Sequence, residues 1–214
     1  PDTLSLAYLP SPGGVRLRLS FRSDTDPDGA SLIDKQFSLL EQIIGRYIMG
    51  YGSDVTVEST VAQMLVDGNA TLSVAESCTG GRISSRFTLL SGASQYFKGG
   101  AVTYCNEAKE NIIGVSADSL REFGAVSEKV AREMAEGVRA KFKSTYSIAT
   151  TGIAGPTGAT IDKPVGTVWI AVSSNTKTIA KLNHFSALRD INIERASSEA
   201  ISMLRELMLE ECIK

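Results

Sequence analysis

The sequence lacks the residues that would indicate a metal hydrolase or a disulfide-stabilised scaffold. It has one histidine, His184, and no CxxC or HExxH motif, so the ligand sets of common zinc sites are missing. Its three cysteines, Cys78, Cys105 and Cys212, are too few and too scattered for a disulfide framework. We therefore predict a protein that uses neither a metal nor a cofactor.

Long apolar runs and a strong net charge are also absent. No apolar stretch reaches the roughly 18 residues of a membrane-spanning helix, and no signal peptide opens the chain. The net charge of -2 gives the whole chain no attraction to nucleic acid or to an anionic membrane. These features predict a cytoplasmic protein without membrane or nucleic-acid partners.

The first 55 residues differ in character from the rest of the chain. Strand patterns at 4–9 and 15–21 flank a Pro- and Gly-rich turn, which predicts a hairpin, and 31–48 has helical periodicity. The hairpin and the helix together predict an α/β unit over residues 1–55. A unit of this length is small for independent stability.

From residue 56 to 214 the pattern alternates between strands and helices, which predicts a three-layer α/β/α domain. The predicted strands are 72–75, 100–104, 146–150, 166–173 and 178–185. The predicted helices begin at 56 and then cover 80–90, 107–113, 127–143 and 191–213.

A polar, glycine-containing turn follows the first strand of this domain. Such a turn places backbone N–H groups and a helix N-terminus at the carboxyl edge of the sheet, where open α/β sheets commonly bind ligands. The plain alternative is an ordinary connection with Thr79 as the helix cap. The turn contains Glu76, Ser77, Cys78, Thr79, Gly80 and Gly81.

A second cluster combines Tyr104, at the end of a predicted strand, with Lys109 near the start of the next helix. A cation there opposes the helix dipole, and burial would lower its pKa further. A neutral lysine can deprotonate a serine hydroxyl such as that of Ser77. Cys78 is a rival nucleophile, since a helix start would favour its thiolate. The plain alternatives are that Lys109 is a solvated surface lysine and that Tyr104 is an ordinary core or rim aromatic.

A third cluster, 149–158, runs from the end of a later strand into a glycine-rich turn, and 164–167 follows shortly after it. Its backbone N–H groups are candidates for binding an oxyanion or a phosphate, and a plain long turn is the alternative. Arg189 and Arg195, at the start of the last helix, are candidates for a phosphate contact or for a solvated helix start. Glu76 is a candidate partner for a lysine or a substrate hydroxyl. Neither the P-loop spacing nor GxGxxG is present.

Five motifs in order resemble the carboxy-terminal domain of the CinA family, which contains nicotinamide mononucleotide deamidases, also called PncC. The resemblance covers about residues 56 to 210 and implies a mixed sheet in the three-layer domain. Residues 6–18 resemble part of the KH-like middle region of full-length CinA, but no GxxG loop is present, so nucleic-acid binding is not expected. The amino-terminal domain usual in the family, and its pyrophosphatase activity, are expected to be absent. The motifs are Ala75–Gly81, Tyr104–Lys109, Gly124–Ser127, Thr151–Pro156 and Lys163–Trp169.

The resemblance implies metal-independent hydrolysis of nicotinamide mononucleotide to nicotinate mononucleotide and ammonia by a homo-oligomer. Ser77 would be the nucleophile, and Lys109 would take its proton while Tyr104 relays or orients it. Ile193 stands where family members often carry a second arginine. The alternative is a protein linked to competence or DNA damage that binds a nucleotide without turnover. The implied substrate contacts are Glu76, Cys78, Thr79, Gly80, Gly81, Asn106, Thr151, Gly152, Ile153, Ala154, Gly155 and Arg189.

Overall fold

The computed structural model describes residues 4–11, 14–22, 29–186 and 188–212. The chain separates into two compact units, Pro1–Val55 and Thr56–Lys214, each with its own internal packing.

The first unit contains a hairpin and a helix. Strand β1 (Leu4–Ser11) pairs antiparallel with β2 (Gly14–Phe21), as the alternating pattern predicts, and helix α1 (Gly29–Ile44) follows. Residues 12 and 13 of the predicted turn lie outside the described residues. The register places Leu4, Leu6 and Tyr8 of β1 opposite apolar residues of β2, so one face of the hairpin is apolar. The helix ends before the predicted residue 48, and a 3-10 turn occupies Gly45–Tyr47.

The second unit is built on a five-stranded mixed sheet in the order β4-β3-β5-β6-β7. Strand β3 lies parallel to β4 and β5, whereas β6 runs antiparallel to both β5 and β7. Every residue of β3 is buried, as expected for a strand covered on both faces. The strands are β3 (Leu72–Glu76), β4 (Phe97–Val102), β5 (Tyr146–Gly152), β6 (Thr167–Ser173) and β7 (Thr178–His184).

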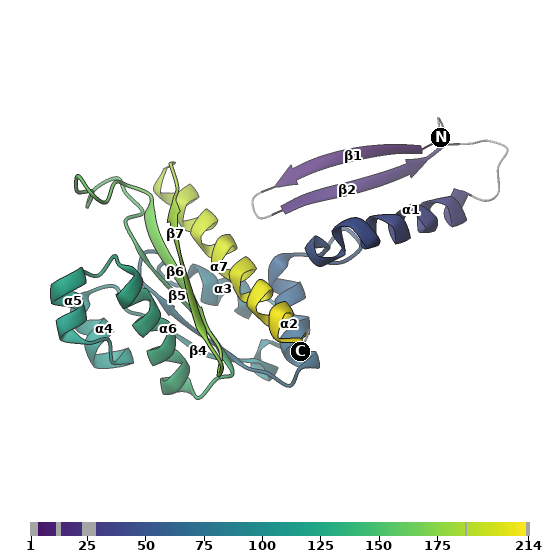
Figure 1. The fold of residues 1–214 in the computed structure, drawn as a ribbon. Coiled ribbons are helices and arrows are strands. Elements are labelled where there is room, and N and C mark those ends of the chain that lie inside the picture. The colour runs from purple at the N-terminus through teal and green to yellow at the C-terminus, as the bar shows by residue number, and fades with distance from the viewer. Residues whose placement is uncertain (1–3, 12–13, 23–28, 187, 213–214) are drawn as a thin grey trace. The chain divides into compact units, whose positions relative to one another are not determined.

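Helices cover both faces of this sheet, which confirms the three-layer prediction (Figure 1). Helices α4 (Asn106–Ile113), α5 (Ala117–Phe123) and α6 (Glu128–Phe142) lie on one face. The other face carries α2 (Val57–Asp67), α3 (Arg82–Thr88) and α7 (Arg189–Cys212). Among the described residues no helix is long and apolar enough to cross a bilayer.

The longest helix on the first face, α6, forms as its sequence predicts. The Ser127 hydroxyl accepts from the Val130 N–H and caps the helix. Val130, Met134 and Val138 recur at four-residue spacing, are fully buried and pack against the sheet. This stripe supplies much of the apolar core between α6 and the strands.

Strand β4 differs from its prediction at both ends. It begins three residues early, at Phe97, and ends at Val102, so Tyr104 lies beyond the strand. Glycine is required within it, because a Cβ at Gly99 would lie 2.5 Å from the Phe142 ring of α6. A short helix that the sequence pattern does not predict, α5, is capped by Ser116.

The topology places the loops that follow β3 and β5 next to one another at the carboxyl ends of these strands. Strand β3 connects through α3 to β4 on one side, and the chain returns through α4, α5 and α6 to β5 on the other side. Because these connections use opposite faces, the carboxyl ends of β3 and β5 lie at the kind of position where open α/β sheets commonly bind ligands.

Candidate active site

Ser77 and Lys109 meet at the carboxyl edge of the sheet. Ser77 follows β3 directly, and its backbone N–H donates to the Thr150 carbonyl of β5. Lys109 lies in the first half of α4, and its Nζ donates to Ser77 Oγ at 3.1 Å and to the Thr103 carbonyl at 2.8 Å. The exposed fractions are 8% for Ser77 and 1% for Lys109. The structure thus brings together two of the three predicted catalytic residues, which lie 32 positions apart in the sequence.

Burial changes the chemistry of the lysine. Removal from water lowers the pKa of Lys109, and the nearby thiol groups of Cys105 and Cys78 act in the opposite direction but are smaller causes. A neutral amine has a lone pair that can take the hydroxyl proton of Ser77. The pair therefore has the geometry and the electrostatics of a nucleophile and its base.

The Glu76 carboxylate holds the start of the helix that follows the loop. Its fully buried carboxylate accepts hydrogen bonds from the N–H groups of Gly81, Ile83 and Ser84 and from the Ser84 hydroxyl. These groups belong to the start of α3, so the carboxylate caps that helix from the end of β3. These four hydrogen bonds come from the start of α3, and no lysine is among the partners of the carboxylate in the described residues, whereas a contact of Glu76 with a substrate stays a prediction.

Two of the backbone N–H groups that were predicted to bind a ligand donate to acceptors within the loop itself. The Gly80 N–H donates to the Ser77 carbonyl, and the Gly81 N–H donates to Glu76. Thr79 does not cap α3, because its hydroxyl bonds to the Thr150 hydroxyl at 2.7 Å and Gly81 is the N-cap residue. Within the described part of the chain, the N–H groups of Cys78 and Thr79 donate to no other residue. They are the loop's available donors for an oxyanion.

Cys78 is not an activated thiol. It is buried, and loss of hydration raises its pKa to about 12, although its own backbone N–H acts in the opposite direction. The expectation that a helix start favours the thiolate is wrong, because Cys78 lies three residues before the N-cap Gly81 and the N-terminus of α3 is already occupied by Glu76. Of the two side chains, Ser77 is the one that accepts a hydrogen bond from the amine among the described residues, since its Oγ lies 3.1 Å from Lys109 Nζ.

Tyr104 belongs to the rim of the site. The residue is 59% exposed, and its hydroxyl accepts from Arg189 Nη2 at 2.8 Å. Arg189 also donates through Nη1 to the Gly155 carbonyl at 2.7 Å. A relay through Tyr104 does not match this geometry, because its hydroxyl is hydrogen-bonded to the arginine and not to Ser77 or Lys109 within the described residues.

The segment after β5 joins the rim to α7. Asn192, which the sequence analysis missed, donates through Nδ2 to the Ala154 carbonyl. Its position three residues after Arg189, on one face of α7, was the available signal. Arg195 is exposed, six residues beyond Arg189 on the same helix. Six residues correspond to more than one and a half helical turns, so Arg195 points away from the face that carries Arg189.

Other predicted contacts have structural partners or remain exposed. The buried Thr151 hydroxyl donates to the Ala125 carbonyl at 2.7 Å, and the Ile153 N–H donates to the Thr167 carbonyl. Gly152 pairs with β6 inside the sheet. Asn106 is the exposed first residue of α4. None of these contacts places a side chain against Ser77.

A wide hollow of about 700 Å³ adjoins the arginine. Its lining does not include Ser77 or Lys109 and is mainly apolar. Ile193, which stands where family members often carry a second arginine, is part of this lining. Arg189 lines the hollow and also bonds to the Tyr104 hydroxyl and to the Gly155 carbonyl in the loop after β5. The residues lining it are Ala154, Gly155, Pro156, Val165, Leu188, Arg189, Asp190 and Ile193.

Residues 54–208 match the family model of the CinA C-terminal domain. The chain belongs to the CinA family. A CinA-like protein of Flavobacterium psychrophilum is 41% identical over 214 residues, which cover all of this chain and 51% of that protein. A CinA-like protein of Salinibacter ruber is 45% identical over 207 residues, covering 97% of this chain and 50% of that protein. The chain thus spans about half the length of the curated relatives it matches.

Solved structures of the CinA superfamily share the fold. The competence damage-inducible protein A of Klebsiella pneumoniae has a TM-score of 0.68 and 33% identity, covering 70% of this chain and 93% of that protein. An Escherichia coli protein of the competence-damaged protein (CinA) superfamily has a TM-score of 0.68 and 34% identity, covering 78% of this chain and 98% of its own. The resemblance expected from the five motifs is confirmed.

Proposed function

We propose that this CinA domain hydrolyses the carboxamide of nicotinamide mononucleotide, releasing ammonia and nicotinate mononucleotide. The observation that carries the proposal is the buried pair in which Lys109 Nζ lies 3.1 Å from Ser77 Oγ. A serine next to a lysine with a lowered pKa suits acyl transfer from an amide. The choice of the mononucleotide rests on the resemblance to the deamidases of this family.

Each step can be assigned to groups of this chain. Lys109 takes the hydroxyl proton as Ser77 Oγ bonds to the carboxamide carbon, and the carbonyl oxygen becomes an oxyanion. The N–H groups of Cys78 and Thr79 are the donors we assign to that oxyanion. The C–N bond then breaks, and the proton held by Lys109 leaves with ammonia. Water attacks the acyl-enzyme while Lys109 takes its proton, and Ser77 regains its hydroxyl.

The rim offers a place for the phosphate. Arg189 has five N–H donors, and the two hydrogen bonds to Tyr104 and Gly155 leave others for an anion. The start of α3 is not a phosphate site in this proposal, because Glu76 already accepts its N–H groups. We therefore place the phosphate at the arginine end and the carboxamide at Ser77.

The test is ammonia release from nicotinamide mononucleotide by the purified chain. We expect turnover by the wild type, complete loss in Ser77→Ala, and retention in Cys78→Ala. Activity of Ser77→Ala at the wild-type rate would refute the nucleophile. Calorimetric binding of the mononucleotide without ammonia release would instead support the alternative function, a protein that binds a nucleotide without turnover.

A further inference from the structure

Glu76 holds both ends of the loop that carries the nucleophile. Its main chain lies in β3, where its carbonyl accepts from the Thr103 N–H at 2.8 Å. Its carboxylate reaches the start of α3 and accepts from the N–H groups of Gly81, Ile83 and Ser84 at 2.8 to 3.0 Å. The loop 77–81 is therefore closed by one residue, the immediate neighbour of Ser77.

The side chains of Glu76 and Ser77 lie on opposite faces of the sheet. Side chains alternate along a strand, so the carboxylate of Glu76 points to the α3 face while Ser77 Oγ points to the α4 face and meets Lys109. A shift of the carboxylate therefore moves the Ser77 backbone relative to the amine of Lys109, which belongs to α4. The 3.1 Å contact between Lys109 Nζ and Ser77 Oγ depends on both attachments.

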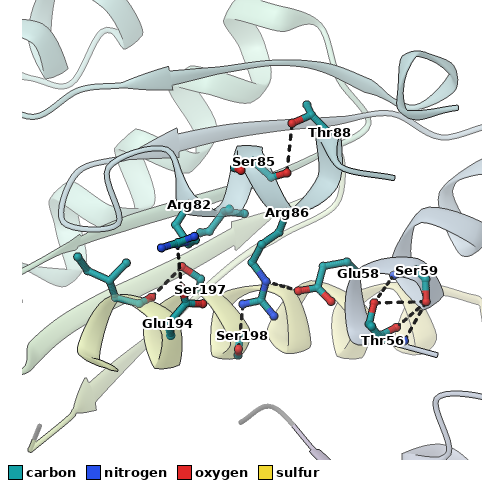
Figure 2. A network of polar contacts seen from close by, with 12 residues as sticks. Thr56, Glu58, Ser59, Arg82, Ser85, Arg86, Thr88, Glu194, Ser197 and Ser198 are labelled. Carbon is teal, nitrogen blue, oxygen red and sulfur yellow. Dashed lines mark hydrogen bonds and ion pairs between the residues drawn. The ribbon is translucent and has the colours of Figure 1, made fainter. Parts of the chain in front are cut away.

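Helix α3 is a fixed anchor for the carboxylate. Figure 2 shows Arg86 of α3 between Glu58 of α2 and Ser198 of α7, and Arg82 of α3 paired with Glu194 of α7. The Arg86–Glu58 pair is largely removed from solvent, with 20% and 8% of the two side chains exposed. Because these contacts join α3 to α2 and α7, they restrain movement of its N-terminus. The position of the Glu76 carboxylate, which is bonded there, is restrained in turn.

We propose that Glu76 is a positioning residue that sets Ser77 Oγ against Lys109 and leaves the Cys78 and Thr79 N–H groups free to bind the oxyanion. This inference rests on the proposed function. A glutamine fits the same space but has one acceptor oxygen, and its NH2 group faces N–H donors. Replacing the carboxylate therefore turns attraction into donor–donor repulsion at the start of α3.

The experiment compares Glu76→Gln with Glu133→Gln in the full chain. Glu133 is a matched control, because its carboxylate also receives hydrogen bonds at a helix start, from the Ser116 N–H and the Ser119 hydroxyl of α5. We expect Glu76→Gln to lower kcat for ammonia release about 100-fold, the scale of an ångström-level misplacement, with KM changed less than threefold. Glu133→Gln should keep the wild-type kcat even where its melting temperature falls.

Labelling of Ser77 by a small fluorophosphonate probe gives a second readout that does not depend on the substrate. We expect the labelling rate to fall in parallel with kcat in Glu76→Gln and to stay at the wild-type value in Glu133→Gln. If the wild type releases no ammonia but is labelled at Ser77, the proposed function fails while the labelling rates still test Glu76.

The proposal is overturned if folded Glu76→Gln keeps kcat and labelling within threefold of wild type, or if Glu133→Gln loses them equally. If Glu76→Gln does not fold, Ser84→Ala removes one of the four hydrogen bonds to the carboxylate and serves instead. A fall of about threefold to tenfold in kcat and in labelling is expected for that variant, because its carboxylate keeps three donors. Wild-type values there would also overturn the proposal.

Discussion

Replacing Lys109 with methionine removes the buried amine. The difference in unfolding free energy between the wild type and this variant therefore reports the titration of that amine alone. Methionine has a similar length and no charge, and the side chain it replaces is 1% exposed. In the folded chain burial lowers the pKa of Lys109, whereas in the unfolded chain the amine keeps its ordinary value near 10.5. The two states therefore bind different numbers of protons over a defined pH range.

The sign follows from linkage. Between the lowered folded pKa and about 10.5 the unfolded state holds the extra proton, so the wild type gains stability as pH rises, by at most about 1.4 kcal/mol per pH unit. Below the folded pKa both states are protonated, and the folded chain then bears the full cost of burying an ammonium group. The methionine variant lacks this dependence. The wild-type minus Lys109→Met difference in unfolding free energy should therefore rise with pH in that window and be flat below it.

Urea denaturation followed by circular dichroism from pH 6 to pH 10 measures this difference. The variant should also lose about 10²- to 10⁴-fold in kcat, the usual contribution of a general base. The acid limb of the wild-type kcat/KM profile should have its midpoint at the low-pH end of the stability window, since both report one amine.

Ser77→Ala is the control for that experiment. It removes the nucleophile but keeps the lysine, so it should be inactive and still show the wild-type dependence of stability on pH. Parallel stability curves for the wild type and Lys109→Met over the whole range would refute the reasoning. A wild-type kcat/KM that does not change with pH where the stability difference does would refute the assignment of Lys109 as the base.

Three further predictions concern the rim, the thiol and the α3 anchor. Arg189→Met should raise KM for nicotinamide mononucleotide about tenfold or more, because a charged contact is lost, and leave KM for the phosphate-free nucleoside nearly unchanged; equal effects on both would exclude a phosphate contact. The Cys78 thiol, with its pKa raised to about 12, should resist iodoacetamide at pH 7.5 in mass spectra of the folded protein, and rapid modification there would contradict its burial. Arg86→Met leaves the Glu58 carboxylate buried without its partner and should lower the unfolding free energy by about 3 kcal/mol in urea titrations; Glu58→Gln combined with it should recover part of that loss, and no recovery would argue against the ion pair.

Several features of this protein follow from local sequence. Period-two and helical patterns predict the hairpin of residues 4–21, the core stripe of α6 and the alternation of strands and helices in the second unit. The Ser127 cap is visible from its residue type and position. Because strand ends meet at one edge of a sheet, the turn after β3 and the start of α4 could be placed together without coordinates.

Other features depend on partners far apart in the sequence. Nothing local shows that Glu76 accepts from α3, that Tyr104 bonds to an arginine 85 residues away, or that Cys78 is buried deeply enough for its pKa to rise to about 12. Short α5 has too few residues for a clear helical period and was missed.

Residue types and spacing by themselves made Ser77 and Lys109 candidates for a nucleophile and its base, because a lysine opposing a helix dipole can act on a nearby hydroxyl. Only the tertiary structure brought their atoms to 3.1 Å and removed the amine from water. The physical reason is that reach and desolvation are set by the packing of β3, α3 and α4 around the pair, whereas the sequence determines only which chemical groups are available there.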